Sequence, residues 1–133
     1  MTASKIGISQ EHLSIILEEL ESNRPFEACG VLLGINEGYV ASIKRVVPVK
    51  NSRRTQYSFE LDSTEFYRIW NDAEKEGMDV VGIYHTHPAN TARPSDRDKK
   101  SMRNFPLIWI IAGNDGVFAY RFVKERLSTV HIV

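Results

Sequence analysis

A short apolar run followed by two histidines is the feature of this sequence that most constrains its fold. Residues 79–84 (Asp-Val-Val-Gly-Ile-Tyr) have the composition of a buried strand, and His85 and His87 come directly after it. Side chains on a strand alternate between its two faces, so both imidazoles are expected on one face at its carboxyl end. The sequence therefore predicts a buried strand that brings two potential metal ligands together.

A serine and an aspartate follow the histidines closely. Ser95 stands directly after Pro94, and Asp98 comes three residues later. With His85 and His87, Asp98 makes three protein ligands for zinc, and a set of three leaves the fourth position open, as in catalytic sites. Ser95 and Asp98 also have the spacing of a helix N-cap with an acidic first turn. That capping role is compatible with catalysis, but alone it explains neither histidine.

The pattern His-x-His-x7-Ser-x2-Asp, with a glutamate on an earlier strand, resembles the signature of the JAMM metallopeptidases, the active branch of the MPN-domain family. Four residues stand at the family spacing: His85, His87, Ser95 and Asp98. Glu27, at the start of the apolar segment 27–34, matches the family's upstream glutamate. The resemblance extends from about Ser9 to the end of the chain.

The resemblance implies a role for each of these residues. His85, His87 and Asp98 would hold one zinc ion per chain, which makes water available as hydroxide at neutral pH. Glu27 would act as general base and then pass the proton to the departing amine. Ser95 would help to stabilise the oxyanion of the tetrahedral intermediate.

The resemblance also implies the substrate class. We expect a zinc metallopeptidase that cleaves the amide bond after the C-terminal Gly-Gly tail of a ubiquitin-like or sulfur-carrier protein. Such a tail can lie extended beside a sheet edge. The segment between Asp98 and the next predicted strand, residues 99–106, is short. Because ubiquitin-chain-specific members carry longer insertions, we expect a compact, prokaryotic-type, deubiquitinase-like member. Whether the bond is an isopeptide, a linear fusion or a carrier–amino-acid adduct stays open.

The remaining chain predicts one α/β domain of the α+β type, residues 1–133. Helices are expected from Ser9 to about Asn23, after the cap Asp62, and over residues 96–103. Further strands are expected at residues 26–35, 39–47, 57–61, 107–112, 117–123 and 127–133. This order favours a curved mixed sheet sandwiched by helices, and the MPN fold implied by the resemblance has this cytidine-deaminase-like architecture.

Two further segments carry expectations. The helix after Asp62 places an aromatic stripe on one face, which we interpret as core: Phe66, Ile69, Trp70 and Ala73. The polar loop at residues 48–56 contains Arg53 and Arg54, which are either solvated or substrate-binding. The residues alone favour a solvated loop tip, and the resemblance strengthens the substrate-binding alternative without settling it.

Composition limits the partners and the location. Seventeen basic and seventeen acidic residues cancel, so no nucleic-acid binding is expected. The first residues lack an apolar signal segment and no stretch has the length of a membrane span, so a cytoplasmic protein is expected. The single cysteine, Cys29, allows no internal disulfide. Monomer and homodimer are both open, since the last strand would be a sheet edge.

Other functions were weighed. A non-catalytic MPN scaffold would not need the five site residues, and a RadC-like DNA-associated protein would be expected to be basic. Zinc deaminases need a Pro-Cys-x-x-Cys pair, and helical zinc proteases need His-Glu-x-x-His; both motifs are absent. Cys29, two residues from Glu27, invites a role as thiol nucleophile, although free cysteines are usually buried small hydrophobes.

Overall fold

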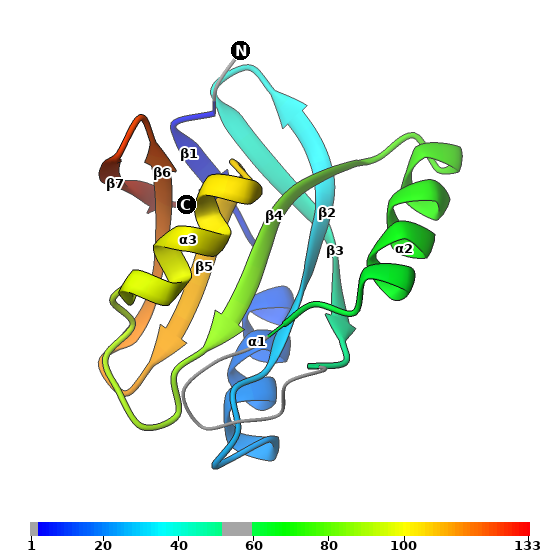
Figure 1. The fold of residues 1–133 in the computed structure, drawn as a ribbon. Helices are drawn as coiled ribbons and strands as arrows, with labels where there is room; N and C mark the ends of the chain where they lie inside the picture. Colours follow the sequence, from blue (N-terminus) through cyan, green and yellow to red (C-terminus); the bar gives the residue numbers. More distant parts are fainter. Residues whose placement is uncertain (1–2, 52–59) are drawn as a thin grey trace.

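The computed structural model describes residues 3–51 and 60–133, which form seven strands and three helices (Figure 1). The strands are β1 (Lys5–Gly7), β2 (Cys29–Glu37), β3 (Val40–Val49), β4 (Asp79–Thr86), β5 (Ile108–Gly113), β6 (Gly116–Val123) and β7 (Arg126–Ile132). The helices are α1 (Gln10–Ser22), α2 (Ser63–Lys75) and α3 (Asp96–Asn104).

The strands form one curved mixed sheet in the order β1-β3-β2-β4-β5-β6-β7. β4 and β5 are parallel, and β1 runs parallel to both β3 and β7, which closes the sheet on itself. The predicted curved mixed sheet is confirmed. Its closure was not predicted, because the three residues of β1 are too short to give a periodic signal. β7 is consequently paired on both sides rather than a free edge.

Helices cover both faces of the sheet. In β2, Leu32 points to the core that contains Ile16 and Leu20 of α1, whereas Val31 and Leu33 point to the opposite side, against Ile69 and Ala73 of α2. α3 lies on the same side as α2, where Met102 packs on Ile83 and Trp109. Each fully buried aliphatic side chain contributes about 1.5–3 kcal/mol to stability. The alternation of side chains along the strands therefore fixes which face of β4 packs against α3.

The predicted helix starts are confirmed by their caps. The Ser9 hydroxyl accepts the His12 N–H at 3.1 Å, and the Asp62 carboxylate accepts the Glu65 N–H at 2.9 Å. α2 ends just before Gly77, which adopts φ +73° and so makes the turn that L-residues rarely make.

The aromatic stripe of α2 is only partly core, which corrects its interpretation. Ile69 and Ala73, one turn apart, are the residues that α2 buries against the sheet. Trp70 remains 40% exposed and its neighbour Tyr67 71% exposed. The Phe66 ring packs edge-on against two rings, that of Trp70 on α2 and that of Phe105, which directly follows α3. Helical periodicity predicts which residues lie on the same face of a helix, but not how much of that face the sheet covers.

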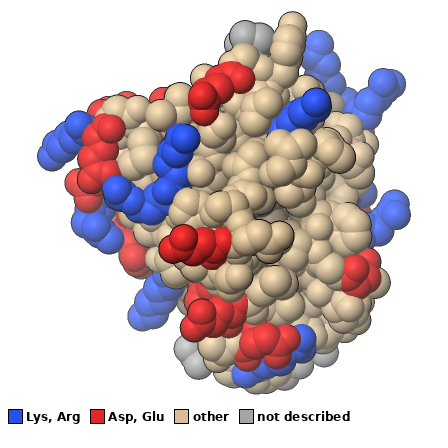
Figure 2. Space-filling view, turned by 180° about the vertical axis from the view of Figure 1, so that it is seen from behind, with Lys and Arg blue, Asp and Glu red and all other residues tan. Residues whose placement is uncertain are grey.

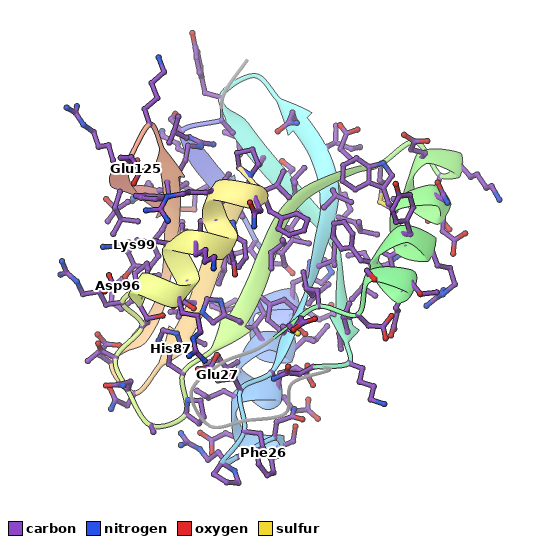
Figure 3. All side chains as sticks on the ribbon, viewed as in Figure 1. Phe26, Glu27, His87, Asp96, Lys99 and Glu125 are labelled. Atoms are coloured by element: carbon purple, nitrogen blue, oxygen red, sulfur yellow. The ribbon has the colours of Figure 1, made fainter. Side chains whose placement is uncertain are left out.

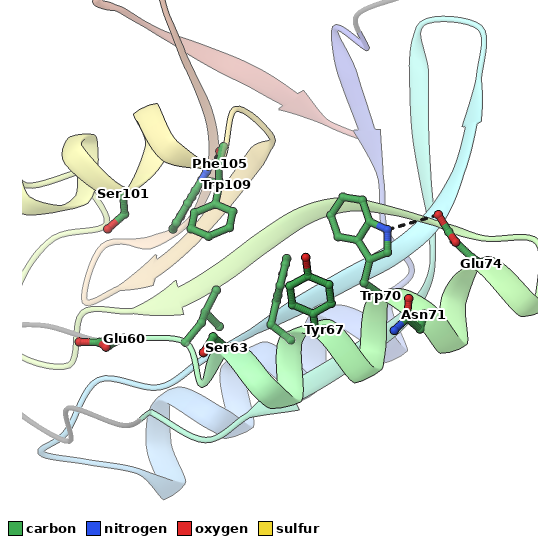
Figure 4. A pocket seen from close by; sticks show the side chains of 11 residues that line it. Glu60, Ser63, Tyr67, Trp70, Asn71, Glu74, Ser101, Phe105 and Trp109 are labelled. Carbon is green, nitrogen blue, oxygen red and sulfur yellow. Dashed lines mark hydrogen bonds between the residues drawn. The ribbon is translucent and has the colours of Figure 1, made fainter.

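Between α2 and α3 these aromatic side chains form a groove of about 650 Å³ (Figure 4). Tyr67 and Trp70 line it from α2, and Phe105 and Trp109 line it from the opposite side. The groove extends to Glu60 and Leu61, at the start of the segment that leads into α2. We call it the aromatic groove below.

Several predicted features lie outside the described residues or next to their boundaries. Arg53 and Arg54, and most of the strand expected at residues 57–61, lie outside the described residues. Leu61 forms an isolated bridge with Asn51. β2 begins at Cys29, two residues later than Glu27, so Glu27 precedes the strand that it was expected to open.

The charged side chains follow the overall charge balance. On the face seen in Figure 2, acidic and basic residues are interspersed around a broad uncharged area. Within the described ranges, none of the helices has the length and apolar character needed to cross a membrane.

Candidate metal centre

Three predicted ligands converge at the carboxyl end of β4. His85 Nε2 lies 3.0 Å from His87 Nε2 and 3.1 Å from Asp98 Oδ1, and His87 Nε2 lies 3.0 Å from Asp98 Oδ2. All three side chains are at least nine-tenths buried. The histidines therefore share one face, as the strand alternation predicts, and α3 supplies the carboxylate from across that face.

The start of α3 holds Asp98 in place. The Ser95 hydroxyl accepts the Asp98 N–H at 3.0 Å, and Asp98 Oδ2 accepts the Ser95 N–H at 2.8 Å. This reciprocal pair is a capping box, so the predicted capping role of Ser95 is confirmed. The same carboxylate that caps the helix faces both histidines, and its position is set by helix geometry.

The loop after β4 orients His87. Its Nδ1 lies 2.8 Å from the Thr91 carbonyl oxygen, which accepts a hydrogen bond from a protonated Nδ1. In the neutral ring this leaves a lone pair on Nε2, the atom that faces Asp98. A ring nitrogen fixed by a backbone carbonyl is the usual outer support of a metal-bound histidine.

Glu27 lies beside the histidines, just before β2. Its side chain is 6% exposed, and within the described ranges no hydrogen-bond partner reaches Oε1. Its carboxylate and the ring nitrogens of His85 and His87 lie within 4.8 Å of one another. Figure 3 shows Glu27 and His87 adjacent at this end of the sheet.

The backbone on both sides of Glu27 is fixed. The Asn51 side-chain amide donates to the Glu27 carbonyl oxygen at 2.9 Å, and the Ala28 N–H donates to Thr86 Oγ1 at 2.8 Å. Asn51 also accepts the Glu60 N–H at 2.9 Å, so it joins the two ends of the segment that precedes α2. Sequence reasoning missed Asn51, because a polar loop residue gives no signal for a contact 24 residues away.

Burial and neighbouring charges set the protonation of the cluster. Burial raises the pKa of Glu27 to about 8, although the charge on His87 opposes the rise. Burial works against ionisation of Asp98, but the two histidines nevertheless hold the pKa of this carboxyl well below its usual range. Burial lowers the pKa of His85. For His87 the bonds to Asp98 and Thr91 outweigh burial and raise the pKa.

These residues fit a divalent metal ion. A tetrahedral zinc with bonds of about 2.0–2.1 Å separates its ligand atoms by about 3.3–3.4 Å, and His85, His87 and Asp98 stand 3.0–3.1 Å apart. Two imidazoles and a carboxylate are a donor set that zinc accepts. Among the described residues, Oε1 of Glu27 has no hydrogen-bond partner, which fits a site for a polar or charged group at the same place. Asp98 lies 3.0–3.1 Å from the two histidine Nε2 atoms, and the Glu27 carboxylate lies within 4.8 Å of the histidine nitrogens, so both carboxylates stand within reach of such an ion.

Cys29 has the properties of a core residue. It is fully buried, it pairs with His85 in the sheet register, and its Sγ lies 3.6 Å from the Val49 carbonyl oxygen. Burial raises the pKa of the thiol to about 12, which disfavours the thiolate that a nucleophile needs. The structure thus favours the core interpretation over the thiol nucleophile.

Comparisons with known proteins agree with this site. The model of a family described as prokaryotic homologs of the JAB domain matches residues 9–123. The chain is 33% identical over 132 residues to a desampylase from Pyrococcus furiosus, covering 98% of this chain and 91% of that protein. It is 31% identical over 115 residues to a probable TtuB-protein conjugate cleaving protease from Thermus thermophilus, covering 86% and 71%.

A third relative and a solved structure extend these matches. The chain is 34% identical over 99 residues to a CysO-cysteine peptidase from Mycobacterium tuberculosis, covering 74% of this chain and 66% of that protein. A solution structure of a protein from Desulfitobacterium hafniense matches with a TM-score of 0.88 and 26% identity, covering 96% of this chain and 91% of that one. The chain therefore belongs to the prokaryotic homologues of the JAB domain, within the JAMM-type family that its sequence resembles.

Proposed function

We propose that this protein is a zinc-dependent peptidase that hydrolyses the amide bond after the C-terminal Gly-Gly tail of a ubiquitin-like or sulfur-carrier protein. The observation that carries the proposal is the convergence of His85, His87 and Asp98 within 3.1 Å, with the buried carboxylate of Glu27 beside them. Relatives named as a desampylase, a TtuB-conjugate protease and a CysO-cysteine peptidase support the substrate class.

In this proposal His85, His87 and Asp98 hold the zinc ion. Zinc, when bound, supplies a Lewis acid and brings the pKa of a bound water to about 7. Asp98 is fixed by the capping box and His87 by its bond to Thr91, so the ligand atoms need little rearrangement on binding. Preorganisation of this kind lowers the ordering cost of binding.

Glu27 moves the proton. Burial raises the pKa of Glu27 to about 8 in the metal-free protein, and the positive charge of a bound zinc would lower it again, so that the carboxylate could accept and return a proton near neutral pH. It first takes the proton from the attacking water and then gives it to the departing amine. Asn51 keeps the Glu27 backbone in place while the side chain remains without a competing partner among the described residues.

Ser95 assists at the carbonyl oxygen of the scissile bond. Its hydroxyl oxygen accepts the Asp98 N–H, which leaves its own O–H available as a donor. A donor directed at the developing oxyanion contributes on the order of 10²–10³ in turnover. The hydroxyl therefore serves the helix and the reaction at once.

The modifier would approach along the aromatic groove. Tyr67 and Trp70 expose large apolar rings there, and exposed aromatic surfaces of this kind are typical of protein-binding sites. The groove reaches Leu61, which bridges to Asn51, and Asn51 contacts Glu27. We infer that the folded part of the modifier rests in the groove and that its tail extends toward Glu27, with Arg53 and Arg54 as proposed contacts to the tail.

Beyond the site, we propose that residues 1–133 act as one catalytic domain, as a monomer or homodimer, in the cytoplasm. No nucleic-acid partner is proposed, since basic and acidic residues balance.

A matched pair of variants tests the metal centre. Asp98→Asn removes the proposed ligand, whereas Asp96→Asn removes an exposed carboxylate from the same first turn of α3. We expect the wild type and Asp96→Asn to bind one zinc and to cleave a Gly-Gly conjugate. Asp98→Asn should bind zinc at least 100-fold more weakly and show no cleavage. A chelator should abolish wild-type cleavage and added zinc should restore it.

The same experiment also tests the alternative that the protein is a non-catalytic scaffold. A zinc-loaded wild type that cleaves no conjugate of ubiquitin or of a sulfur-carrier protein would contradict the proposed function. Equal zinc binding by Asp98→Asn and Asp96→Asn would contradict the assigned ligands.

A further inference from the structure

A second pocket opens beside Glu27 and is separate from the aromatic groove. It has a volume of about 380 Å³ and is lined by Glu27 and His87 together with the loop residues Asn90, Thr91, Arg93 and Ser95. It shares no lining residue with the aromatic groove. If the modifier tail arrives from the groove, this pocket lies on the leaving-group side of the scissile bond.

Arg93 is the one arginine or lysine among the pocket's lining residues in the described chain. It is exposed, and none of the ion pairs that the described residues form involves it. An arginine without a partner presents a planar fork of N–H donors that matches a carboxylate. The pocket is therefore suited to a small anionic group.

The loop presents Arg93 from a fixed position. The residue before it, Ala92, is fully buried and its N–H donates to Asp115 Oδ1 at 2.7 Å. The carbonyl oxygen of Asn90 accepts the Asn114 N–H at 2.9 Å. Pro94, on the other side, is buried as well. Contacts on both sides of Arg93 thus fix its backbone, and only the side chain is left to adjust to a ligand.

The loop also packs against the end of β5 without spare room. A Cβ added to Gly113 would lie 2.4 Å from the Ala92 nitrogen, so glycine is required there for the two backbones to approach. The position of Arg93 is therefore set by the sheet itself rather than by the loop alone.

We propose that this pocket holds the leaving group and that Arg93 binds the α-carboxylate of a single amino acid released from the carrier. The inference rests on the proposed function and deepens it. In the reaction, water adds its oxygen to the Gly carbonyl carbon and the C–N bond breaks. The carrier leaves as a carboxylate, and both protons of the water end on the amine of the amino acid, which leaves as an ammonium group.

The chemistry of the alternatives supports this choice. An amino acid attached through its α-amine has its carboxylate two bonds from the scissile nitrogen, next to the site of cleavage. A lysine in an isopeptide, or the first residue of a linear fusion, has no free carboxylate near that position. An arginine that lines one pocket with Glu27 and His87, and that takes part in none of the ion pairs among the described residues, thus favours the amino-acid adduct over the other two.

The test compares two forms of one substrate. Ubiquitin extended after its Gly-Gly tail by one alanine is prepared with a free α-carboxylate or as the alaninamide. We expect the zinc-loaded wild type to cleave the acid with a kcat/KM about 10–100-fold higher than the amide, as one charge-assisted bidentate contact provides. Arg93→Gln should lower kcat/KM for the acid by that factor and leave the amide unchanged.

Arg97 supplies the matched control. It is also exposed and outside the described ion pairs, and its charge acts on Glu27, but it does not line the pocket. Arg97→Gln should change both rates alike and keep their ratio. Unchanged zinc content and melting temperature would show that Arg93→Gln is folded.

The outcomes separate the two levels of the inference. A wild type that cleaves acid and amide equally well, or an Arg93→Gln variant that keeps the preference for the acid, would overturn the role of Arg93 alone. Cleavage of neither form by the zinc-loaded wild type would count against the proposed function itself.

Discussion

At the scale of single residues, Glu27 is a site residue that lowers the stability of the folded protein. A buried carboxyl group with one oxygen unsatisfied among the described residues is unfavourable for folding. The family signature was sufficient to select Glu27, His85, His87, Ser95 and Asp98 as candidates that the fold brings together, and their roles in catalysis stay predictions. No sequence signal indicated Asn51 or Arg93, because their contacts depend on how distant loops pack.

Replacement of Glu27 by glutamine should separate metal binding from turnover. Glu27→Gln keeps the shape of the side chain but transfers no proton, so we expect zinc binding to persist and kcat to fall about 10²–10⁴-fold. Metal analysis and conjugate cleavage on the same sample would measure both. Full activity in this variant would rule out the general-base role.

The same variant should also change the pH dependence of stability. The metal-free folded state keeps the Glu27 proton up to about pH 8, whereas the unfolded chain loses it near 4.5. Wild-type stability therefore falls as pH rises through this window, by up to about 1.4 kcal/mol per pH unit, and levels off above it. In urea unfolding of metal-free protein, the free energy of unfolding of Glu27→Gln should therefore rise relative to that of the wild type as the pH is raised from 5 to 8.

At the scale of helices and strands, the helix starts were predicted from local sequence and the helix surroundings were not. N-caps and glycine ends are local signals, so the starts at Ser9, Asp62 and Ser95 could be read from neighbouring residues. The exposure of Trp70 depends on the width of the sheet surface beneath α2, which no periodicity reports.

Two serines that cap helices allow the structural and chemical roles of Ser95 to be separated. Ser9→Ala and Ser95→Ala each remove a hydroxyl that accepts one backbone N–H, at 3.1 and 3.0 Å. Each should destabilise the protein by about 1 kcal/mol. Only Ser95→Ala should also lower kcat, by about 10²–10³-fold, since Ser9 lies on α1. If Ser9→Ala and Ser95→Ala changed kcat equally, Ser95 would act only as a helix cap.

The aromatic groove can be tested with two exposed aromatic residues. Trp70→Ala should raise KM for a protein conjugate about 10-fold or more, because large aromatic side chains dominate interface energies. Tyr39→Ala, at a 65% exposed residue of the β2–β3 turn outside the groove, should leave KM unchanged. Both variants should unfold within about 1 kcal/mol of the wild type, since neither side chain is buried. A KM unaffected by Trp70→Ala would contradict docking in the groove.

At the scale of the whole molecule, the short β1 has a larger effect than its length suggests. It joins β3 to β7 and places Ile6 in the core with no exposed surface. Ile6→Ala should therefore cost about 2–5 kcal/mol, whereas Ile35→Ala, at a 41% exposed position of β2, should cost much less. Denaturant unfolding of both variants would measure the difference, and similar costs would argue against a closed sheet.

The origin of the metal ligands also determines how the site opens. His85 belongs to β4, which is hydrogen-bonded on both sides by β2 and β5, so its amide should exchange with solvent only when the whole protein unfolds. Asp98 belongs to the nine-residue α3, whose first turn can open separately. If His85, His87 and Asp98 hold an ion as proposed, its lifetime should depend on the fluctuations of this short helix, and tightening the first turn should slow metal loss without altering the strand that carries the histidines.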